Sequence, residues 1–175
     1  MSAQLASVHS LIPEPAVRGL ILHVDDDDAL RRSTSLLLRA AGFETREAAS
    51  GEQALIHAEA LRDRLDVLIV DDYLGPGISG AEVAEEFARL LGQAVPTVIL
   101  TGDPANAEVP WLRDAPVWMA RKPLSPETLL AALPPLVAFR RAIAAVAPPT
   151  GQFDSPLSAA ARTAEARAAD SFRFP

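Results

Sequence analysis

The chain has 175 residues, of which 49% are hydrophobic, which is enough for one well-buried core but not for two full domains. Its 23 acidic and 16 basic residues give a formal charge of −7, which disfavours direct binding to nucleic acid or to an anionic membrane. It has no cysteine, which excludes disulfides and thiolate metal sites. No apolar run reaches the length of a membrane span and no signal peptide is visible at residues 1–19, so we expect a cytoplasmic protein.

The chain divides by composition into three segments. Residues 1–18 are expected to form a flexible leader, residues 19–146 a single domain, and residues 147–175 a Pro- and Ala-rich tail with one candidate helix at 156–169. Within the domain, short apolar segments alternate with segments of helical periodicity. The predicted strands are 20–24, 43–48, 67–70, 96–100 and 116–120, and the predicted helices begin near residues 28, 51, 81 and 126.

This alternation predicts an α/β fold with a five-stranded parallel sheet and helices on both faces. For a segment of this length the flavodoxin-like (βα)5 arrangement, with strand order 2-1-3-4-5, is the expected topology. Pro134 and Pro135 are expected to break the last helix at about Leu133. The helix after this break has an apolar stripe, which we expect to dock a second copy of the chain or a partner; its residues are Leu136, Phe139, Ile143 and Val146.

Polar side chains follow four of the predicted strands where each one ends. They are Asp25 and Asp26, then Asp71 and Asp72, then Thr101, and finally Lys122. Because the carboxyl ends of parallel strands meet at one edge of the sheet, we expect these groups to share a crevice there. Clustered carboxylates suit Mg²⁺, while a lysine and a hydroxyl suit phosphoryl oxygens. One carboxylate would remain free to attack phosphorus, so the pattern indicates formation of an aspartyl phosphate.

Two neighbouring carboxylates compete for that role. Asp71 and Asp72 both follow Val70 at the end of the predicted strand. Side chains alternate between the faces of a strand, so only one of the two can point into the crevice. From the residues alone, either Asp71 or Asp72 could be the acceptor.

Four motifs in order make residues 20–146 resemble the receiver domains of two-component response regulators. The motifs are Val24-Asp25-Asp26-Asp27 with Arg31, the loop Asp72 to Gly80, Val98-Ile99-Leu100-Thr101-Gly102, and Arg121-Lys122-Pro123. The chain looks like a stand-alone receiver. One departure from the family pattern is Met119, which stands where the family usually has a Tyr or Phe that rotates with the switch.

The resemblance implies a role for each motif residue. Asp72 would accept the phosphoryl group from a phosphohistidine on a sensor histidine kinase or phosphotransfer protein, because Pro76 and Gly80 follow it at the family's spacing. Asp71 is the alternative, because counting from Asp66 makes the strand one residue longer than is usual in the family. Mg²⁺ would be held by carboxylates and by one backbone carbonyl; its ligands would be Asp25, Asp26, Asp72 and the carbonyl of Leu74. Lys122 and Thr101 would contact the phosphoryl group, which the backbone N–H groups of Tyr73 and Gly102 would also help to bind. The Lys122–Pro123 peptide bond would be compatible with a cis geometry.

Other functions remain as alternatives. The fold could act as an interaction module that signals without phosphate, and Met119 favours this mildly. A Mg²⁺-dependent phosphohydrolase usually carries a second acid two residues after its nucleophile, but Leu74 holds that position, so we expect no enzyme of that kind. Gly75, Gly77 and Gly80 fit the dinucleotide fingerprint, yet acidic residues separate them from the strand and would repel a pyrophosphate.

Overall fold

The structure, a computed structural model, describes residues 17–93, 95–104 and 116–146. In that part of the chain, five parallel strands pair in the order β2-β1-β3-β4-β5, which confirms the predicted fold and topology. The strands are β1 (Leu20–Val24), β2 (Glu44–Ala48), β3 (Leu65–Asp71), β4 (Thr97–Thr101) and β5 (Val117–Arg121). The helices are α1 (Asp28–Ala40), α2 (Gly51–Leu61), α3 (Gly80–Leu91) and α4 (Pro126–Val146). The candidate tail helix at 156–169 and most of the expected leader lie outside the described residues.

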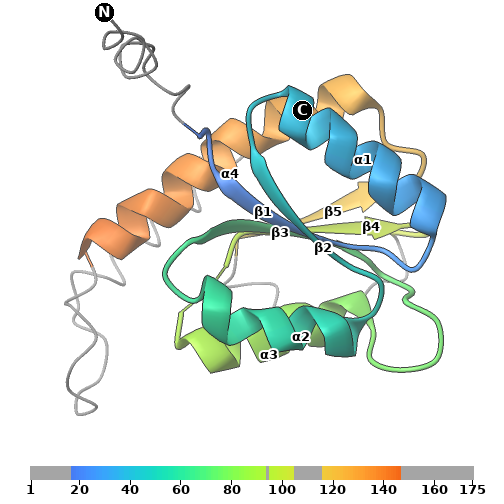
Figure 1. Ribbon diagram of the computed structural model, residues 1–175, viewed down its shortest axis with the longest axis horizontal. Coiled ribbons are helices and arrows are strands. Elements are labelled where there is room, and N and C mark those ends of the chain that lie inside the picture. Colours follow the sequence, from blue (N-terminus) through green and yellow to red (C-terminus); the bar gives the residue numbers. More distant parts are fainter. Residues whose placement is uncertain (1–16, 94, 105–115, 147–175) are drawn as a thin grey trace, which may run out of the picture.

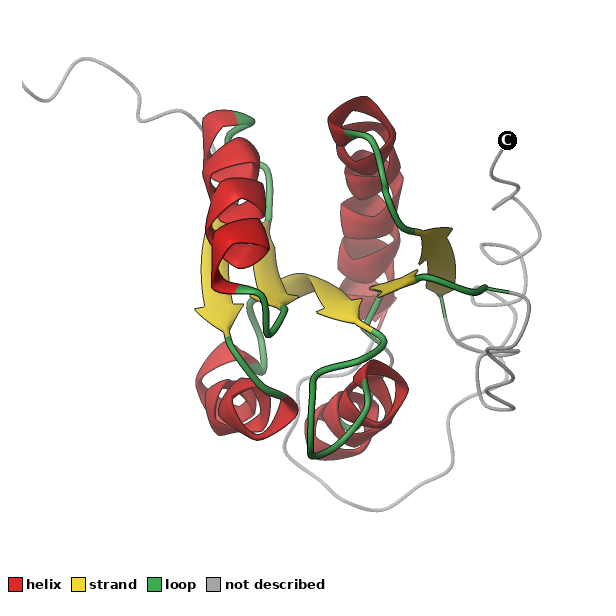
Figure 2. Ribbon diagram, turned by 90° about the vertical axis from the view of Figure 1, so that its right-hand side faces the viewer, coloured by secondary structure: helices red, strands yellow, loops and turns green. Residues whose placement is uncertain are grey.

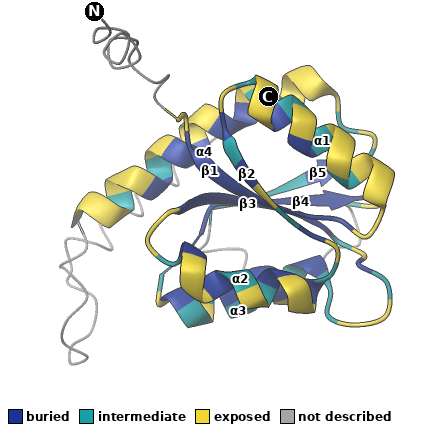
Figure 3. Ribbon diagram, in the orientation of Figure 1, coloured by how far each residue is buried: buried dark blue, intermediate teal, exposed yellow. Residues whose placement is uncertain are grey.

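Helices cover both faces of the sheet. Helices α1 and α4 lie on one face, and α2 and α3 lie on the other (Figures 1 and 2). The strands alternate between two apolar cores, since Leu22 and Val24 of β1 pack toward α2 and α3 while Ile21 packs toward α1 and α4. Figure 3 shows the consequence, with buried strands and exposed outer helix surfaces. The sheet is therefore buried on both faces, as parallel sheets usually are.

The last residue of the expected leader is part of the fold. The backbone N–H of Arg18 donates to the carbonyl of Gly42 at 3.0 Å. Its guanidinium lies over the ring of Phe43, 5.0 Å from the ring centroid. These contacts correct the predicted boundary, because residue 18 belongs with the domain rather than with the leader.

The predicted break in the last helix is wrong. Helix α4 continues through Pro134 and Pro135 without interruption. Both prolines are exposed. The helix hydrogen bonds that they cannot donate are therefore lost on the side of α4 that water can reach. Leu133 and Leu136, on either side of them, are buried against the sheet. Packing on both sides of the proline pair therefore holds one helix where local sequence rules predict two.

Helix α4 is also long and apolar enough to span a membrane by length and composition, with a mean hydropathy of 1.4 over Pro126–Ala145. This was not expected from the sequence, where no such run was identified. Three of its apolar side chains, Leu129, Leu133 and Leu136, are buried in the core between α4 and the sheet. The apolar character of the first half of α4 is thus accounted for by packing inside the domain.

Candidate acidic site at the carboxyl edge of the sheet

Three carboxylates meet where β1 and β3 end. Asp25 and Asp26 follow β1, Asp71 is the last residue of β3, and ligand atoms of the three all lie within 4.8 Å of one another. The two strands are neighbours, with Val24 paired to Val70, so their ends reach the same point of the sheet edge. The acids that follow the first and third strands therefore lie close together at this edge of the sheet.

A lysine from the far edge of the sheet completes the cluster. The Nζ of Lys122 lies 2.5 Å from the Oδ2 of Asp71, and the two residues are 51 positions apart in the sequence. Lys122 directly follows β5, and its backbone N–H donates to the carbonyl of Thr101 at the end of β4. The Lys122–Pro123 peptide bond is cis, as the family resemblance suggested. One cation is therefore placed against three carboxylates.

The structure places Asp71 in this cluster and leaves Asp72, the carboxylate preferred from the sequence, outside it. Strand β3 runs one residue further than predicted and pairs Asp71 with Leu100 of β4. Val67, Ile69 and Asp71 alternate onto one face of the sheet, so Asp72 falls on the opposite face. Asp72 donates its backbone N–H to the carbonyl of Leu100, and its carboxylate is not among the grouped ligands.

The loop after β3 brings backbone groups to Asp71. The N–H of Tyr73 points at the Oδ1 of Asp71 at a distance of 3.4 Å, while the Tyr73 side chain is exposed. At Gly80, a Cβ atom would lie 2.2 Å from the carbonyl oxygen of Asp71, so only glycine fits there without a shift of the backbone. The start of α3 is thus packed directly against the main chain of Asp71.

Asp25 is the most enclosed of the three acids. It is fully buried; its Oδ1 accepts the N–H of Asp27 at 2.9 Å, and its Oδ2 is buried without a hydrogen-bond partner. Burial raises the pKa of the Asp25 carboxyl, and the nearby charges of Asp71 and Asp26 raise it further. Arg31 donates to the Asp25 carbonyl at 2.8 Å and so fixes the backbone rather than neutralising the carboxylate.

The donor set fits a hard divalent cation. It consists of carboxylate oxygens on the sheet edge, with an exposed side chain at Asp26. The orphaned Oδ2 of Asp25 and the mutual proximity of three like charges both favour an added cation. Oxygen-only donors with room for water match Mg²⁺ better than a transition metal. Asp25, Asp26 and Asp71 are the side chains that would hold it.

Three other residues that the sequence predicts for the site also lie near this edge of the sheet. Thr101 is 4% exposed at the end of β4, and its Oγ1 accepts the N–H of Asp103 at 3.2 Å. Gly102 is exposed just beyond it. The side chain of Leu74 is buried in the core on the α2 and α3 side of the sheet. The contacts predicted for Thr101, Gly102 and the Leu74 carbonyl remain predictions.

A buried histidine lies just before the acids. His23 is fully buried in β1, and neither ring nitrogen has a hydrogen-bond partner. Burial lowers the pKa of His23 from its usual 6.5 to about 4, so the neutral ring is strongly favoured. His23 pairs with Glu47 of β2 and Ile69 of β3 in the sheet register. It is a core residue whose polar atoms are unsatisfied.

Comparison with known proteins places the chain in one family. The family model described as the response regulator receiver domain matches residues 21–134. The chain therefore belongs to the response regulator receiver domain family. Members of this family act in two-component signal transduction, where they interact with histidine kinases or phosphotransfer proteins.

Several curated regulators are similar over the same region. The DNA-binding response regulator MtrA of Mycolicibacterium smegmatis is 34% identical over 116 residues, which is 66% of this chain and 49% of MtrA. The phosphate regulon transcriptional regulatory protein PhoB of Pseudomonas aeruginosa is 36% identical over 116 residues, covering 65% of this chain and 49% of PhoB. The chain thus spans about half the length of these relatives.

Solved receiver structures share the architecture. A response regulator receiver domain from Clostridium thermocellum superposes with a TM-score of 0.64 at 25% identity, covering 71% of this chain and 98% of that one. The receiver domain of the hybrid histidine kinase CckA gives a TM-score of 0.57 at 34% identity, covering 68% and 99% of the two chains. The chemotaxis response regulator CheY4 of Vibrio cholerae gives 0.59 at 30% identity, with coverage of 67% and 98%.

Proposed function

We propose that the chain is a phosphorylatable receiver in a two-component phosphorelay and that Asp71 is its phosphoacceptor. The observation that carries the proposal is the contact between Asp71 and Lys122 within a cluster of acids from β1 and β3. The donor would be a phosphohistidine on a sensor histidine kinase or phosphotransfer protein, the partners with which family members interact.

The residues of the site divide the work of phosphoryl transfer. A carboxylate oxygen of Asp71 attacks phosphorus, and the bond from phosphorus to the histidine nitrogen of the donor breaks. Lys122 supplies a compact positive charge next to the transferred group. The N–H of Tyr73, which already points at Oδ1, donates to a phosphoryl oxygen. Mg²⁺, held by Asp25, Asp26 and Asp71, would neutralise negative charge on the oxygens of the transferred phosphoryl group.

Moving the acceptor by one residue changes which backbone carbonyl we expect the metal to bind. If the metal takes the carbonyl two residues after the acceptor, that carbonyl belongs to Tyr73 rather than to Leu74. Thr101 lies at the end of β4, next to β3, and we expect its hydroxyl to turn from the Asp103 N–H toward the phosphoryl group. Such a turn would alter the loop after β4 and produce a conformational signal.

The test is intact mass after incubation with Mg²⁺ and a small-molecule phosphodonor. The native chain and Asp72→Asn should each gain one phosphoryl group, and Asp71→Asn should gain none. Because Asp72→Asn removes the neighbouring charge, it is the matched control for Asp71→Asn. Loss of the phosphoryl group only in Asp72→Asn would overturn the assignment to Asp71.

An interaction module that signals without phosphate is the second candidate. It is favoured by Met119, which occupies a half-buried position in β5 where the family usually carries an aromatic residue. It predicts no added mass in the native chain under the same conditions, with Mg²⁺ still bound. The proposal of a phosphorylatable receiver predicts the opposite result.

The partners of the phosphorylated form are also a proposal. In the second half of α4, which runs beyond the sheet in Figure 1, Phe139 and Ile143 are half-buried. We propose that this part of α4 forms a homodimer, in a cytoplasmic protein that binds neither nucleic acid nor membrane itself. Although several relatives are called DNA-binding, the match to MtrA covers only 49% of that protein. A monomer in both phosphorylation states, unchanged by Phe139→Ser and Ile143→Ser, would overturn the dimer.

A further inference from the structure

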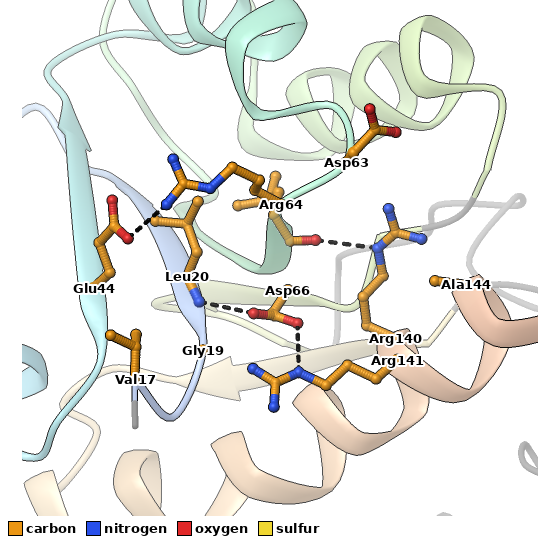
Figure 4. A pocket seen from close by; sticks show the side chains of 11 residues that line it. Val17, Gly19, Leu20, Glu44, Asp63, Arg64, Asp66, Arg140, Arg141 and Ala144 are labelled. Carbon is orange, nitrogen blue, oxygen red and sulfur yellow. Dashed lines mark hydrogen bonds and ion pairs between the residues drawn. The ribbon is translucent and has the colours of Figure 1, made fainter. Parts of the chain in front are cut away.

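Two largely buried arginines each donate to a backbone carbonyl at the end of a strand. Arg140 of α4 donates to the carbonyl of Leu65 at the start of β3, at 3.1 Å, and Figure 4 shows it reaching there from the helix. Arg31 of α1 donates from Nη1 to the carbonyl of Asp25, just past the end of β1, at 2.8 Å. Arg140 lies at the edge of the sheet opposite the acids, whereas Arg31 holds one of the acids themselves.

The guanidinium of Arg31 contacts three parts of the chain, and its side chain is only 12% exposed. Nη1 donates to the Asp25 carbonyl, and Nη2 lies 2.5 Å from the Oδ1 of Asp28 at the start of α1. Nε lies 4.0 Å from the Oε2 of Glu47 in β2. A planar guanidinium can make such contacts together because its five N–H donors point in fixed directions. Arg31 therefore ties the residue after β1 to both α1 and β2.

Asp25 is held at three of its polar atoms. Its backbone N–H donates to the carbonyl of Ala48 in β2 at 3.2 Å, and its Oδ1 accepts the N–H of Asp27 at 2.9 Å. Its carbonyl is the third atom, which Arg31 holds. The fourth polar atom, Oδ2, is buried without a partner in a carboxylate that lies beside those of the other two acids. Fixing the first three atoms fixes the place of the oxygen that is left for a cation.

We propose that Arg31 is a positioning residue for the divalent cation. It cannot be a ligand itself, because a guanidinium has no acceptor and keeps its charge. It acts through Asp25, whose backbone it holds so that Oδ2 stays at the site. The inference rests on the Mg²⁺ site of the proposed function. Groups that hold metal ligands in place commonly contribute about 10- to 100-fold to metal affinity.

The charge of Arg31 and its hydrogen bond act on a bound cation in opposite directions. A guanidinium repels Mg²⁺, so a variant that lost only this charge would bind Mg²⁺ more tightly. A variant that loses the anchor on Asp25 binds it less tightly. Arg32 is the matched control, because its guanidinium pairs with the same Asp28, at 2.9 Å, from a side chain that is 71% exposed.

The test titrates Mg²⁺ into the full chain at constant ionic strength and follows amide resonances, so that affinity is read from the folded protein alone. Arg31→Gln should raise the dissociation constant about tenfold. Arg31→Lys keeps the charge and a donor but lacks the planar fork, so it should recover part of this loss. Arg32→Gln should stay within about twofold of the native chain, because exposed charges are screened. Native or tighter affinity in Arg31→Gln would overturn the proposal.

Hydrogen exchange in the metal-free chain tests the anchor separately from the metal site. The Asp27 N–H, which is bonded to Asp25, should exchange several times faster in Arg31→Gln but not in Arg32→Gln. The Val83 N–H in α3 should keep its native rate in both variants, which excludes a general loss of stability. Unchanged exchange at Asp27 in Arg31→Gln would overturn the role of Arg31. Faster exchange there in a chain that binds no Mg²⁺ would instead overturn the metal site, and with it the function proposed for this anchor.

Discussion

A buried acid lies near each end of β3, and the two acids differ in how their negative charge is balanced. Asp66, near the start of the strand, has one oxygen bonded to the N–H of Leu20 and the other to Arg141. Asp71, at the end of the strand, shares Lys122 with two further carboxylates within 4.8 Å. The first acid is balanced by the fold, whereas the second belongs to a group with more negative than positive charge.

This difference distinguishes buried polar groups that stabilise the fold from buried polar groups that are available for binding. Buried polar groups that stabilise a fold are normally satisfied within it, as Asp66 is. The Oδ2 of Asp25 is unsatisfied and also lies in a cluster of three carboxylates, and the two observations together indicate a place for a cation. These observations support the proposed Mg²⁺ site at the carboxyl edge of the sheet.

The largest loss of stability is expected from replacing Asp66, the acid whose charge is balanced within the fold. Asp66→Ala removes the acceptor of a buried N–H and the counter-ion of Arg141, and should lower the free energy of unfolding by about 3 kcal/mol. Urea denaturation followed by circular dichroism measures the loss. Asp63→Ala, at an exposed neighbour, should change stability by less than about 0.5 kcal/mol. Equal effects of the two variants would contradict the structural role of Asp66.

The next effect concerns His23 and depends on pH. Its pKa in the folded chain, about 4, lies below the 6.5 of the unfolded chain, so between these values the unfolded state binds more protons. Stability should therefore be complete above pH 6.5 and fall by up to about 3 kcal/mol as pH drops to about 4. Urea denaturation of the metal-free chain and of His23→Leu across this range measures it. A stability difference between them that does not vary with pH would contradict the prediction.

A smaller effect tests the packing behind the proposed acceptor. In Gly80→Ala the new Cβ would lie 2.2 Å from the carbonyl oxygen of Asp71, so the backbone must move, at a cost of about 2 kcal/mol. The shift should also slow phosphorylation, measured as the rate of mass gain. Gly102→Ala meets no atom within 4 Å and is the stability control. A Gly80→Ala chain as stable as this control would show that the contact carries no strain.

The smallest expected effect is an increase in stability rather than a loss. Asp26 is exposed, and its carboxylate lies beside those of Asp25 and Asp71, so Asp26→Asn should stabilise the metal-free chain by about 0.5 kcal/mol. Added Mg²⁺ should stabilise the native chain but not Asp26→Asn, because binding to the folded state alone raises stability. Thermal unfolding with and without Mg²⁺ checks both statements. An equal shift in melting temperature in both chains would remove Asp26 from the metal site.

Much of the site at the carboxyl edge of the sheet could be predicted, because the positions of its residues follow from the strand order. Once the order 2-1-3-4-5 is assumed, the ends of β1, β3 and β5 must converge, and Asp25, Asp26 and Lys122 come with them. The choice between Asp71 and Asp72 needed more than motif spacing. The alternation that places Val67 and Ile69 on the face of Asp71 is the sequence signal that supports the proposed acceptor.

The errors arose where distant contacts override local rules. Pro134 and Pro135 have the local signature of a helix break, but α4 is held to the sheet by Leu133 and Leu136 on either side of them. Arg140 has no sequence signal at all, because its partner carbonyl at Leu65 is 75 residues away. Contacts of this range appear only once the chain is folded.

The identity of the phosphorylated residue tests the account most directly. The native chain is phosphorylated with Mg²⁺ and a small-molecule donor, then treated with borohydride, which reduces an acyl phosphate to the alcohol and so converts the modified aspartate to homoserine. Tandem mass spectrometry of the peptide spanning β3 and the following loop then locates the change. Homoserine at position 71, with an intact aspartate at position 72, is the predicted result. Homoserine at position 72 would contradict the assignment of the carboxylate paired with Lys122 as the phosphoacceptor.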